Sequence, residues 1–427
     1  MLHAKTLAAV VIASLGVAHA QNGLAGAATP SPSPTIDPQL QQEWTKTLHQ
    51  VEDVITAFAR KNQLPINDPL FPWLQTTPTP APTTTTPVTT TPAPTTKTPS
   101  PANQGGQGGQ GGQGNQQGGQ TGPQGKPKCA IMVNPKDEHN IQVNCAKTDR
   151  LRFIGLGDWG EEFVAPYVLA VRDGVIKEAK TNTFDFILAV GDNFYQNGVA
   201  NTTDALWRST WLDRWQIGTN LTLPWIAFMG NHDWYGNAQS QIDYSKSQEV
   251  GAKYWIMPSK YYSVDTINPV GKKFKITVLD TMTMGAPDFE WAAKEFNDPT
   301  ADFVLAAGHH QVYSAAKRGD NTTEPMLKLK SLVENTDKVK AYLCGHEHDM
   351  QFLRAANKDY FMFGGGGRTL NEAETGPGTK AEVVFFKKKY GFATFDVAIS
   401  TRTVVVTYHV FDSQGNEIET PVFTRKY

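Results

Sequence analysis

From residue 129 onward the chain alternates short apolar runs with polar stretches, and the residues before it lack this pattern. The stretch 161–183, between the first two runs, has helical periodicity, so the beginning of this region is typical of a strand, a helix and a second strand. We therefore predict one α/β domain over residues 127–427. The predicted strands lie in LRFIGLGDWG (151–160), FDFILAVGDNFY (184–195), LPWIAFMGNHDW (223–234), FKITVLDTMT (274–283), DFVLAAGHH (302–310), KAYLCGHEH (340–348), DYFMFGGGG (359–367), GFATFDVAIS (391–400) and TVVVTYHVFD (403–412).

The residues before this domain follow other patterns. Within the segment 21–75, residues 39–62 carry apolar side chains at helical spacing, which predicts one amphipathic helix. That helix either packs on the main domain or on a second copy, or it binds an unknown partner. Residues 76–126 are rich first in Thr and Pro and then in Gly and Gln. Because neither tract can bury enough apolar surface to offset its chain entropy, we expect a disordered stalk that links the two parts.

Residues 1–20 have the form of a secretory signal peptide. A weakly basic start is followed by an apolar stretch and by Ala18-His19-Ala20, a small-residue cleavage site. We therefore expect export and a secreted, extracellular protein. A membrane anchor is the alternative, but the apolar stretch is shorter than the roughly 20 residues that span a bilayer. No other stretch comes close, so no membrane span is expected.

The charge and the cysteine content indicate which partners are not expected and which cysteines can pair. The net charge of −2 and the scattered basic residues argue against nucleic acid or a membrane surface as a partner. Of the three cysteines, Cys129 and Cys145 flank a short segment and are expected to pair in an oxidising compartment. Cys344 is expected to be a buried thiol, with a ligand role as the alternative. Three sequons predict glycosylated surface loops, at Asn201, Asn220 and Asn321.

Candidate chemistry gathers where five of the apolar runs end. Each run gives way to glycine and then to side chains that can bind metal, in GD, GDNFY, GNHD, GHH and GHEH. Because ligands collect at the carboxyl ends of the strands in an open α/β sheet, we expect one site at one sheet edge. In an edge strand, His346 and His348 would share a face. The candidate side chains are Asp158, Asp192, Tyr195, Asn231, His232, His309, His346 and His348.

This mixture of ligands predicts a particular metal chemistry. Carboxylate, imidazole and amide ligands suit iron, zinc or manganese better than calcium, which prefers oxygen alone. Two such ions about 3.5–4 Å apart can bind one phosphate ester and generate a hydroxide for in-line attack. A single Gly-Asp is usually a turn and a single histidine is usually structural, but five such turns together predict hydrolysis of a phosphoester.

The series GDWG, GDNFY, GNHD, AGHH and GHEH resembles the five blocks of the calcineurin-like metallophosphoesterases. Tyr195 narrows the resemblance to the purple acid phosphatases. The stretches GDNFYQNGV, GNHDWYGNAQSQIDYSK and VLDTMTM resemble the small, mammalian-type tartrate-resistant members. The likeness covers roughly residues 150–410. It implies a β-sandwich flanked by helices, in the order α/β/β/α.

The resemblance also implies a set of ligands for two metal ions per chain. A ferric ion would be held by Asp158, Asp192, Tyr195 and His348. The second ion, ferrous iron, zinc or manganese, would be held by Asp192, Asn231, His309 and His346. Asp192 would then bridge the two ions, and the Tyr195 phenolate would give the purple colour and keep the first iron ferric.

Other positions are implied to contact substrate. His232 would donate a proton to the leaving group or contact phosphate beside Asn231, and Asp233 would either orient it or cap the next helix. His310 stands where the small relatives usually carry an aromatic residue, so it is left out of the metal ligands and predicted only as a substrate contact. The run GGGGRT (364–369) is interpreted as a flexible turn, with a loop lining the site as the alternative.

Two departures from the family pattern change the expectations. Arg318 or Lys317, in AAKRGD, replaces a second substrate-side histidine, and neither can shuttle a proton near neutral pH. The pH optimum that the family implies is therefore left open. The connection GAPDFEW (285–291) is short where mammalian-type members insert a repressive loop, so activation by loop cleavage is not predicted.

Together these patterns predict a secreted binuclear acid phosphatase in which a metal-bound hydroxide attacks phosphate monoesters. Its substrates would be small esters, nucleotides or phosphoproteins, and the stalk could contact a wall or matrix. One alternative is a phosphodiesterase or nucleotidase on the same fold. The other is a stalked surface interaction protein with a vestigial metal domain.

Overall fold

The computed structural model describes residues 129–427 except 220 and 371–377. The predicted signal peptide, the amphipathic helix and the stalk lie outside the described residues, as does Asn220. All nine predicted strand runs contain a strand, and the predicted helix in 161–183 is α3 (Pro166–Thr181).

The strands form two mixed sheets. The larger sheet has the order β1-β2-β7-β8-β9-β10-β12-β11-β13, and the smaller has β16-β15-β14-β3-β4-β5-β6 with β17 paired to β15. The strands of the larger sheet are β1 (Ala130–Val133), β2 (Asn140–Asn144), β7 (Tyr262–Ile267), β8 (Lys273–Leu279), β9 (Phe303–Gly308), β10 (Val339–Cys344), β11 (Met350–Ala355), β12 (Lys358–Phe363) and β13 (Glu382–Lys387). Those of the smaller sheet are β3 (Arg150–Leu156), β4 (Phe186–Val190), β5 (Trp225–Phe228), β6 (Trp255–Ile256), β14 (Tyr390–Ala398), β15 (Thr403–Phe411), β16 (Glu417–Glu419) and β17 (Val422–Lys426).

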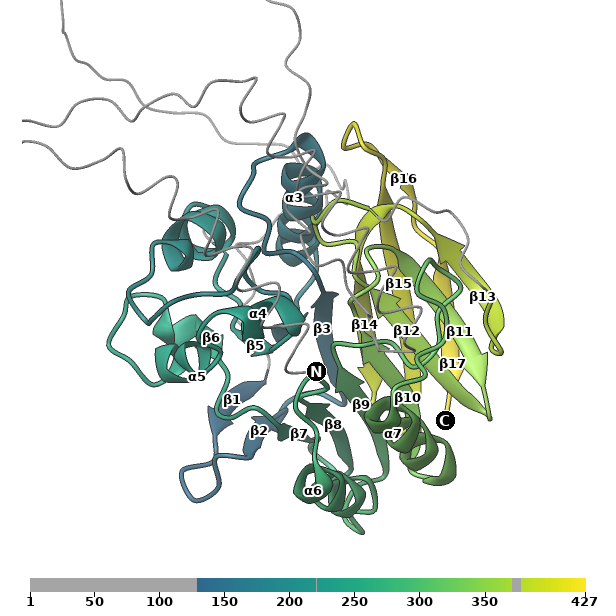
Figure 1. Cartoon of the computed structure of the whole chain (residues 1–427). Helices are drawn as coiled ribbons and strands as arrows, with labels where there is room; N and C mark the ends of the chain where they lie inside the picture. The colour runs from purple at the N-terminus through teal and green to yellow at the C-terminus, as the bar shows by residue number, and fades with distance from the viewer. Residues whose placement is uncertain (1–128, 220, 371–377) are drawn as a thin grey trace, which may run out of the picture. The chain divides into compact units, whose positions relative to one another are not determined.

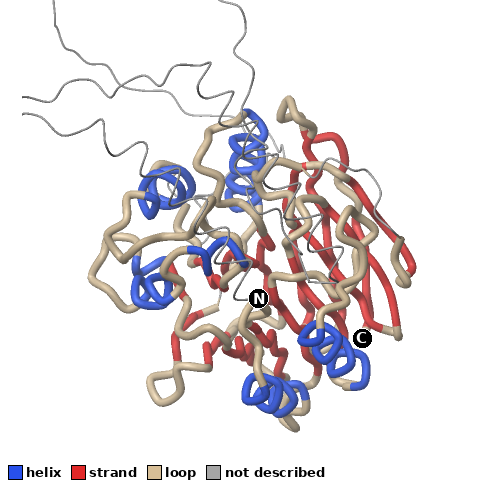
Figure 2. The backbone as a smooth tube through the Cα atoms, viewed as in Figure 1, coloured by secondary structure: helices blue, strands red, loops and turns tan. Residues whose placement is uncertain are grey.

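Helices cover the outer faces of both sheets (Figures 1 and 2). Besides α3, the helices are the π-helix η2 (Trp207–Gln216), α4 (Asn231–Tyr235), α5 (Gln239–Ser245), the 3-10 turn η3 (Ala252–Tyr254), α6 (Ala286–Phe296) and α7 (Glu324–Asn335). One cluster of buried side chains joins α3, η2 and α5 to the smaller sheet. Another joins α6 and α7 to the larger sheet.

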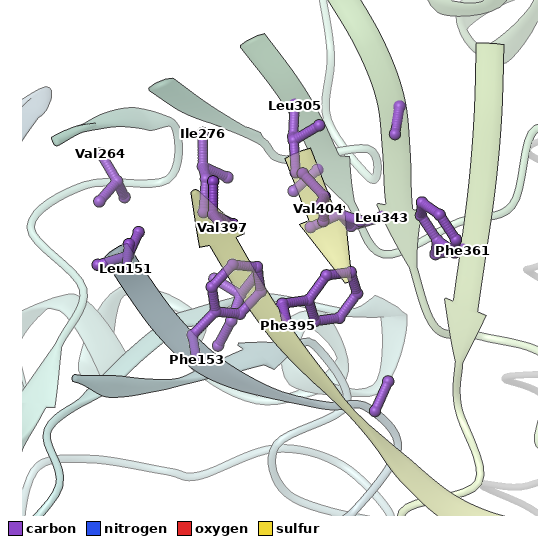
Figure 3. Close-up of a cluster of buried hydrophobic side chains, with 14 of the residues drawn as sticks. Leu151, Phe153, Val264, Ile276, Leu305, Leu343, Phe361, Phe395, Val397 and Val404 are labelled. Atoms are coloured by element: carbon purple, nitrogen blue, oxygen red, sulfur yellow. The ribbon is translucent and has the colours of Figure 1, made fainter. Parts of the chain in front are cut away.

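The main core lies between the two sheets. Side chains alternate along each strand, so every second residue points inward, and these residues form one continuous buried cluster. Figure 3 shows Phe153 and Phe395 from the smaller sheet near Leu305 and Leu343 from the larger one. The layers are therefore helix, sheet, sheet, helix, which confirms the predicted α/β/β/α order.

Parallel pairing sets the position of the predicted site. Strands β3, β4 and β5 are parallel neighbours in the smaller sheet, so their carboxyl ends lie at one edge. In the larger sheet, β8, β9, β10 and β12 are likewise parallel neighbours. The five ligand-bearing turns thus come from two facing sheets. The expectation of a single sheet edge was wrong, because the chain divides its parallel strands between both layers.

The cysteines adopt the predicted states. Cys129 and Cys145 form a disulfide that joins the residue before β1 to the residue after β2. Cys344 is a buried free thiol whose side chain packs in the core under α6 and α7. Within the part of the chain that the structure describes, no helix is long and apolar enough to cross a membrane.

Candidate metal centre

The predicted ligands sit in tight turns at the ends of the strands. Asp158, Asp192 and His346 all have left-handed backbones, with φ of 57°, 52° and 72°. Such φ values are uncommon outside glycine and cost of order 1–3 kcal/mol each, so they persist only where surrounding contacts hold them. A side chain on Gly230 or Gly345, each directly before a ligand, would collide with the carboxylates of Asp192 and Asp158.

One group of ligand atoms surrounds the Tyr195 hydroxyl. It lies 3.1 Å from Oδ1 of Asp158, 2.9 Å from Oδ2 of Asp192 and 3.4 Å from Nε2 of His348. Among the described residues, Asp158, Asp192 and His348 offer ligand atoms that all lie within 4.8 Å of one another. These four residues are the ones predicted to hold the ferric ion.

A second group surrounds Nε2 of His309. It lies 3.2 Å from Oδ1 of Asn231, 3.2 Å from Nδ1 of His346 and 3.4 Å from Oδ1 of Asp192. Asp192 therefore directs one carboxylate oxygen to each group. The structure brings together all seven predicted ligands in the two predicted sets; that these atoms bind metal stays a prediction.

Neighbouring hydrogen bonds fix two of the imidazoles for ligation. Nδ1 of His309 donates to the carbonyl of Val190 at 2.9 Å, and Nδ1 of His348 donates to the carbonyl of Thr369 at 2.7 Å. In the neutral ring, each bond leaves Nε2 as the nitrogen with a free lone pair, the arrangement common in metal sites. The buried carboxylate, phenol, amide and imidazole donors thus fit two transition-metal ions.

The metal-free centre has strongly shifted acidities. Burial disfavours the charged form of Asp192, but His309 and His232 outweigh burial and hold the pKa of that carboxyl well below its usual range. Burial also lowers the pKa of His309, but Asp192 and Asp158 raise it to about 10. Burial, Asp158 and Asp192 together raise the pKa of Tyr195 well above its usual value. Cations bound here would replace the proton on His309.

The helix α4 presents the predicted proton donor. The His232 ring lies 4.5 Å from the Tyr195 ring, and its Nδ1 donates to the carbonyl of Gln196 at 2.7 Å. Its backbone N–H donates to Asp192 at 2.9 Å. The Asp233 carboxylate accepts from the backbone N–H of Gly230, the residue before α4, at 2.7 Å. Of the two roles left open for Asp233, helix capping is therefore the one observed.

His310 lies at the edge of the centre and outside both ligand groups. Its ring is 4.4 Å from that of His346, and its Nδ1 lies 2.9 Å from the hydroxyl of Thr281. Burial, and then the charge of His309, lower the pKa of His310 to about 3. The ring is therefore neutral near neutral pH. The Thr281 hydroxyl also accepts from the His310 backbone N–H at 3.1 Å, so it holds both the backbone and the ring of His310.

The structure also distinguishes Lys317 from Arg318, the two cations in the loop after β9. Lys317 is exposed, whereas Arg318 is partly buried. The backbone N–H of Arg318 donates to the Glu347 carboxylate at 2.7 Å. Burial is the main cause of the lowered pKa values of His310 and His348, and the charge of Arg318 also lowers both. Nε of Arg318 lies 3.9 Å from the Glu347 carboxylate.

Two expectations about neighbouring residues were wrong. His346 and His348 lie in a turn after β10, because the left-handed backbone of His346 ends the strand. The run 364–369, interpreted as a flexible turn, is buried up to Arg368 and lines the centre. Its backbone bonds Gly157 and Asp158.

Sequence reasoning thus missed Thr369 and Arg368. A signal was present, because the run follows an apolar strand just as the five ligand turns do. That strand, β12, is parallel to β10 and ends at the same edge of the larger sheet.

Comparisons with known proteins agree with this geometry. A family model of the calcineurin-like phosphoesterases matches residues 151–350. Tartrate-resistant acid phosphatase type 5 is 34% identical in Sus scrofa, over 54% of this chain and 73% of that protein. The same enzyme of Homo sapiens is 32% identical, over 61% of this chain and 87% of that protein. Purple acid phosphatase 3 of Arabidopsis thaliana is 26% identical, over 62% and 76% respectively.

A solved structure adds support for the fold. GAP50, the anchor in the inner membrane complex of Plasmodium, superposes with a TM-score of 0.54 at 20% identity, over 65% of this chain and 88% of that chain. At that identity the likeness concerns the fold alone. By sequence, the chain belongs to the calcineurin-like phosphoesterases and, within them, to the binuclear purple acid phosphatases of the tartrate-resistant type: it is a metal-dependent acid phosphatase.

Proposed function

We propose that this acid phosphatase is an exported phosphomonoesterase that works with one Fe(III) ion and one Fe(II), Zn(II) or Mn(II) ion. The observation that carries the proposal is Asp192, which directs one oxygen to the Tyr195 group at 2.9 Å and the other to the His309 group at 3.4 Å. A carboxylate shared by both groups can bridge two adjacent ions. Tyr195 belongs to only one of the two groups, and its phenolate suits ferric iron, so that group would hold Fe(III).

The residues around the centre have separate tasks in this mechanism. When bound, the two metal ions would neutralise phosphate and activate the attacking water. His232 is fixed through Nδ1 on the Gln196 carbonyl, and in its doubly protonated form it would donate the second proton, on Nε2, to the leaving-group oxygen. Asn231 and the His310 side chain would contact phosphate oxygens. These roles remain proposals drawn from the resemblance and from the positions of the side chains.

The charge of Arg318 supports a preference for monoesters. A monoester dianion carries one more negative charge than a diester, and Arg318 adds a permanent positive charge that acts on His310 and His348 even though Glu347 lies 3.9 Å from its Nε. Small esters, nucleotides and phosphoproteins all present such a dianion. Initial rates on a phosphomonoester and on the matching diester test this preference. Comparable rates on the two would favour the phosphodiesterase or nucleotidase alternative.

The metal assignment is tested by a visible absorption spectrum and metal analysis on one purified sample. We expect a broad visible band, about two metals per chain and at least one iron, with the band lost in Tyr195→Phe. A colourless protein with two zinc or manganese ions would keep hydrolysis but refute the purple-type centre. Protein that stays metal-free after reconstitution would support the interaction-protein alternative.

Export and a tethering stalk complete the proposal, and they are supported by sequence alone. Secreted protein should begin after Ala20, as N-terminal sequencing would show; a retained residue 1 would contradict export. Deletion of residues 21–125 should reduce retention at the cell surface or matrix and leave turnover unchanged. Unchanged retention would refute tethering, and lost turnover would show that catalysis depends on the N-terminal part.

A further inference from the structure

Arg368 lies against the centre although no metal-binding turn contains it. It follows β12 in the run GGGGR and is buried, with 5% of its surface exposed. The guanidinium carbon lies 4.8 Å from the centroid of the Tyr195 ring. A cation at this distance from an aromatic face attracts the electrons of the ring, and burial reduces the screening of that attraction.

The other contacts of Arg368 reach further parts of the centre. Its backbone N–H donates to the carbonyl of Asp158 at 3.0 Å. Its Nη2 donates to the side-chain oxygen of Gln196 at 3.2 Å. The backbone carbonyl of Gln196 in turn accepts from His232. One arginine thus contacts a predicted ligand ring, the backbone of a second ligand, and the residue that holds the predicted proton donor.

A counter-charge fixes the guanidinium. Nη1 of Arg368 forms a buried ion pair with Glu161, which is 4% exposed. Arg214 holds the backbone of this segment by donating to the carbonyls of Glu161 and Glu162. Because several buried contacts oppose its movement, Arg368 has one defined position over the Tyr195 ring.

We propose that Arg368 is a positioning residue that orients Tyr195 and Gln196 and supplies the positive charge that tunes the Tyr195 phenolate. This inference rests on the proposed Fe(III)–Tyr195 centre. In the visible transition an electron moves from the phenolate to the iron, so a positive charge over the ring stabilises the donor electrons. Removing that charge lowers the transition energy, and adding net positive charge raises it.

The test compares iron-loaded full-length variants with the wild type. Arg368→Gln removes the charge and keeps a donor for Gln196, so its visible band should move to longer wavelength. Glu161→Gln leaves the guanidinium charge uncompensated, so its band should move to shorter wavelength. Arg368→Lys keeps the charge and should return the band most of the way to the wild-type position. Arg368→Gln should also lower kcat about 10-fold or more, with KM within about twofold.

Arg425→Gln is the matched control, because Arg425 also pairs with a buried carboxylate, Asp359, and lies 6.0 Å over a ring, Phe352, away from the centre. Its band should equal that of the wild type. A band that is unmoved in both Arg368→Gln and Glu161→Gln, or moved the same way in both, would overturn the inference. If Arg368→Gln does not fold, the direction in Glu161→Gln decides. A wild type without a visible band would instead refute the proposed iron centre.

Discussion

Replacing Asp233 with alanine should destabilise the protein more than any loss of packing volume would explain. The Asp233 carboxylate is fully buried and joins the two turns that carry Asp192 and Asn231. It accepts from the backbone N–H groups of Gly230 at 2.7 Å, Asn193 at 3.1 Å and Phe194 at 3.2 Å. It also accepts from the amide of Gln241 at 2.7 Å.

The magnitude follows from the donors left without a partner. The Asn193 side-chain amide can keep its 3.0 Å bond to the Gln241 oxygen, but the Gln241 amide N–H loses its acceptor unless it turns or meets water. The backbone N–H groups of Gly230, Asn193 and Phe194 cannot move away. Each unsatisfied buried donor costs about 1–3 kcal/mol, so with some water entry we expect a loss of about 3–5 kcal/mol in the free energy of unfolding.

The measurement is urea unfolding of the metal-free full-length protein, wild type against Asp233→Ala. Asp243→Ala is the control, since Asp243 is exposed on α5 and should change stability by less than about 0.5 kcal/mol. A loss below about 1 kcal/mol for Asp233→Ala would show that water or neighbouring groups satisfy the donors, and the reasoning would be wrong. Affinity for metal should also fall, by about 10–100-fold, because the two ligand turns are no longer joined.

Three further predictions concern catalysis and pH. His232→Ala should lower kcat about 10²–10⁴-fold on alkyl phosphates and far less on p-nitrophenyl phosphate, whose leaving group needs no proton; equal losses would contradict a proton donor. Arg318→Ala should lower kcat/KM about 10-fold or more through loss of the positive charge proposed to attract the phosphate dianion, whereas the exposed Lys317→Ala should not. Burial, and then the Asp192 charge, raise the pKa of Asp233 from 3.8 to about 7, so the folded state binds this proton more tightly than the unfolded chain. The free energy of unfolding of the metal-free protein should therefore decrease from about pH 4 to pH 7 because of this group. Asp233→Asn lacks the titrating carboxyl, so its free energy of unfolding should change with a different slope over this pH range; identical slopes would refute the prediction.

Much of the fold could be predicted because strand and helix signals are local. Apolar runs of strand length identified nine strands, and one periodic stretch identified α3. Short strands without strong alternation, such as β6, and short helices, such as α4, carry too few residues for a periodic signal. The π-helix η2 was also missed, although its buried tryptophans recur every fourth residue and Arg208, Ser209 and Asp213 are exposed on it.

The candidate ligands were predictable for a similar reason, while their neighbours were not. Each ligand turn is recognisable in the sequence from an apolar run that is followed by a glycine and a metal-binding side chain. Arg368 and Thr369 follow a similar run but carry no such side chain at its end, so they were interpreted as part of a flexible turn. The choice of Arg318 over Lys317 was also open, because adjacent residues in a loop have no fixed periodicity.

The sequence by itself determined nine of the strands, the ligand types and the family, since these depend on patterns within about ten residues and on matched motifs. Only the tertiary structure decided that two facing sheets share the centre and that Asp192 divides its oxygens between two groups. It also decided that Arg368 covers the Tyr195 ring. These arrangements join residues far apart in the chain, as in the 2.9 Å bond from the His346 N–H to Asp158 across 188 positions. Such contacts arise from the packing of whole layers, which no local pattern specifies.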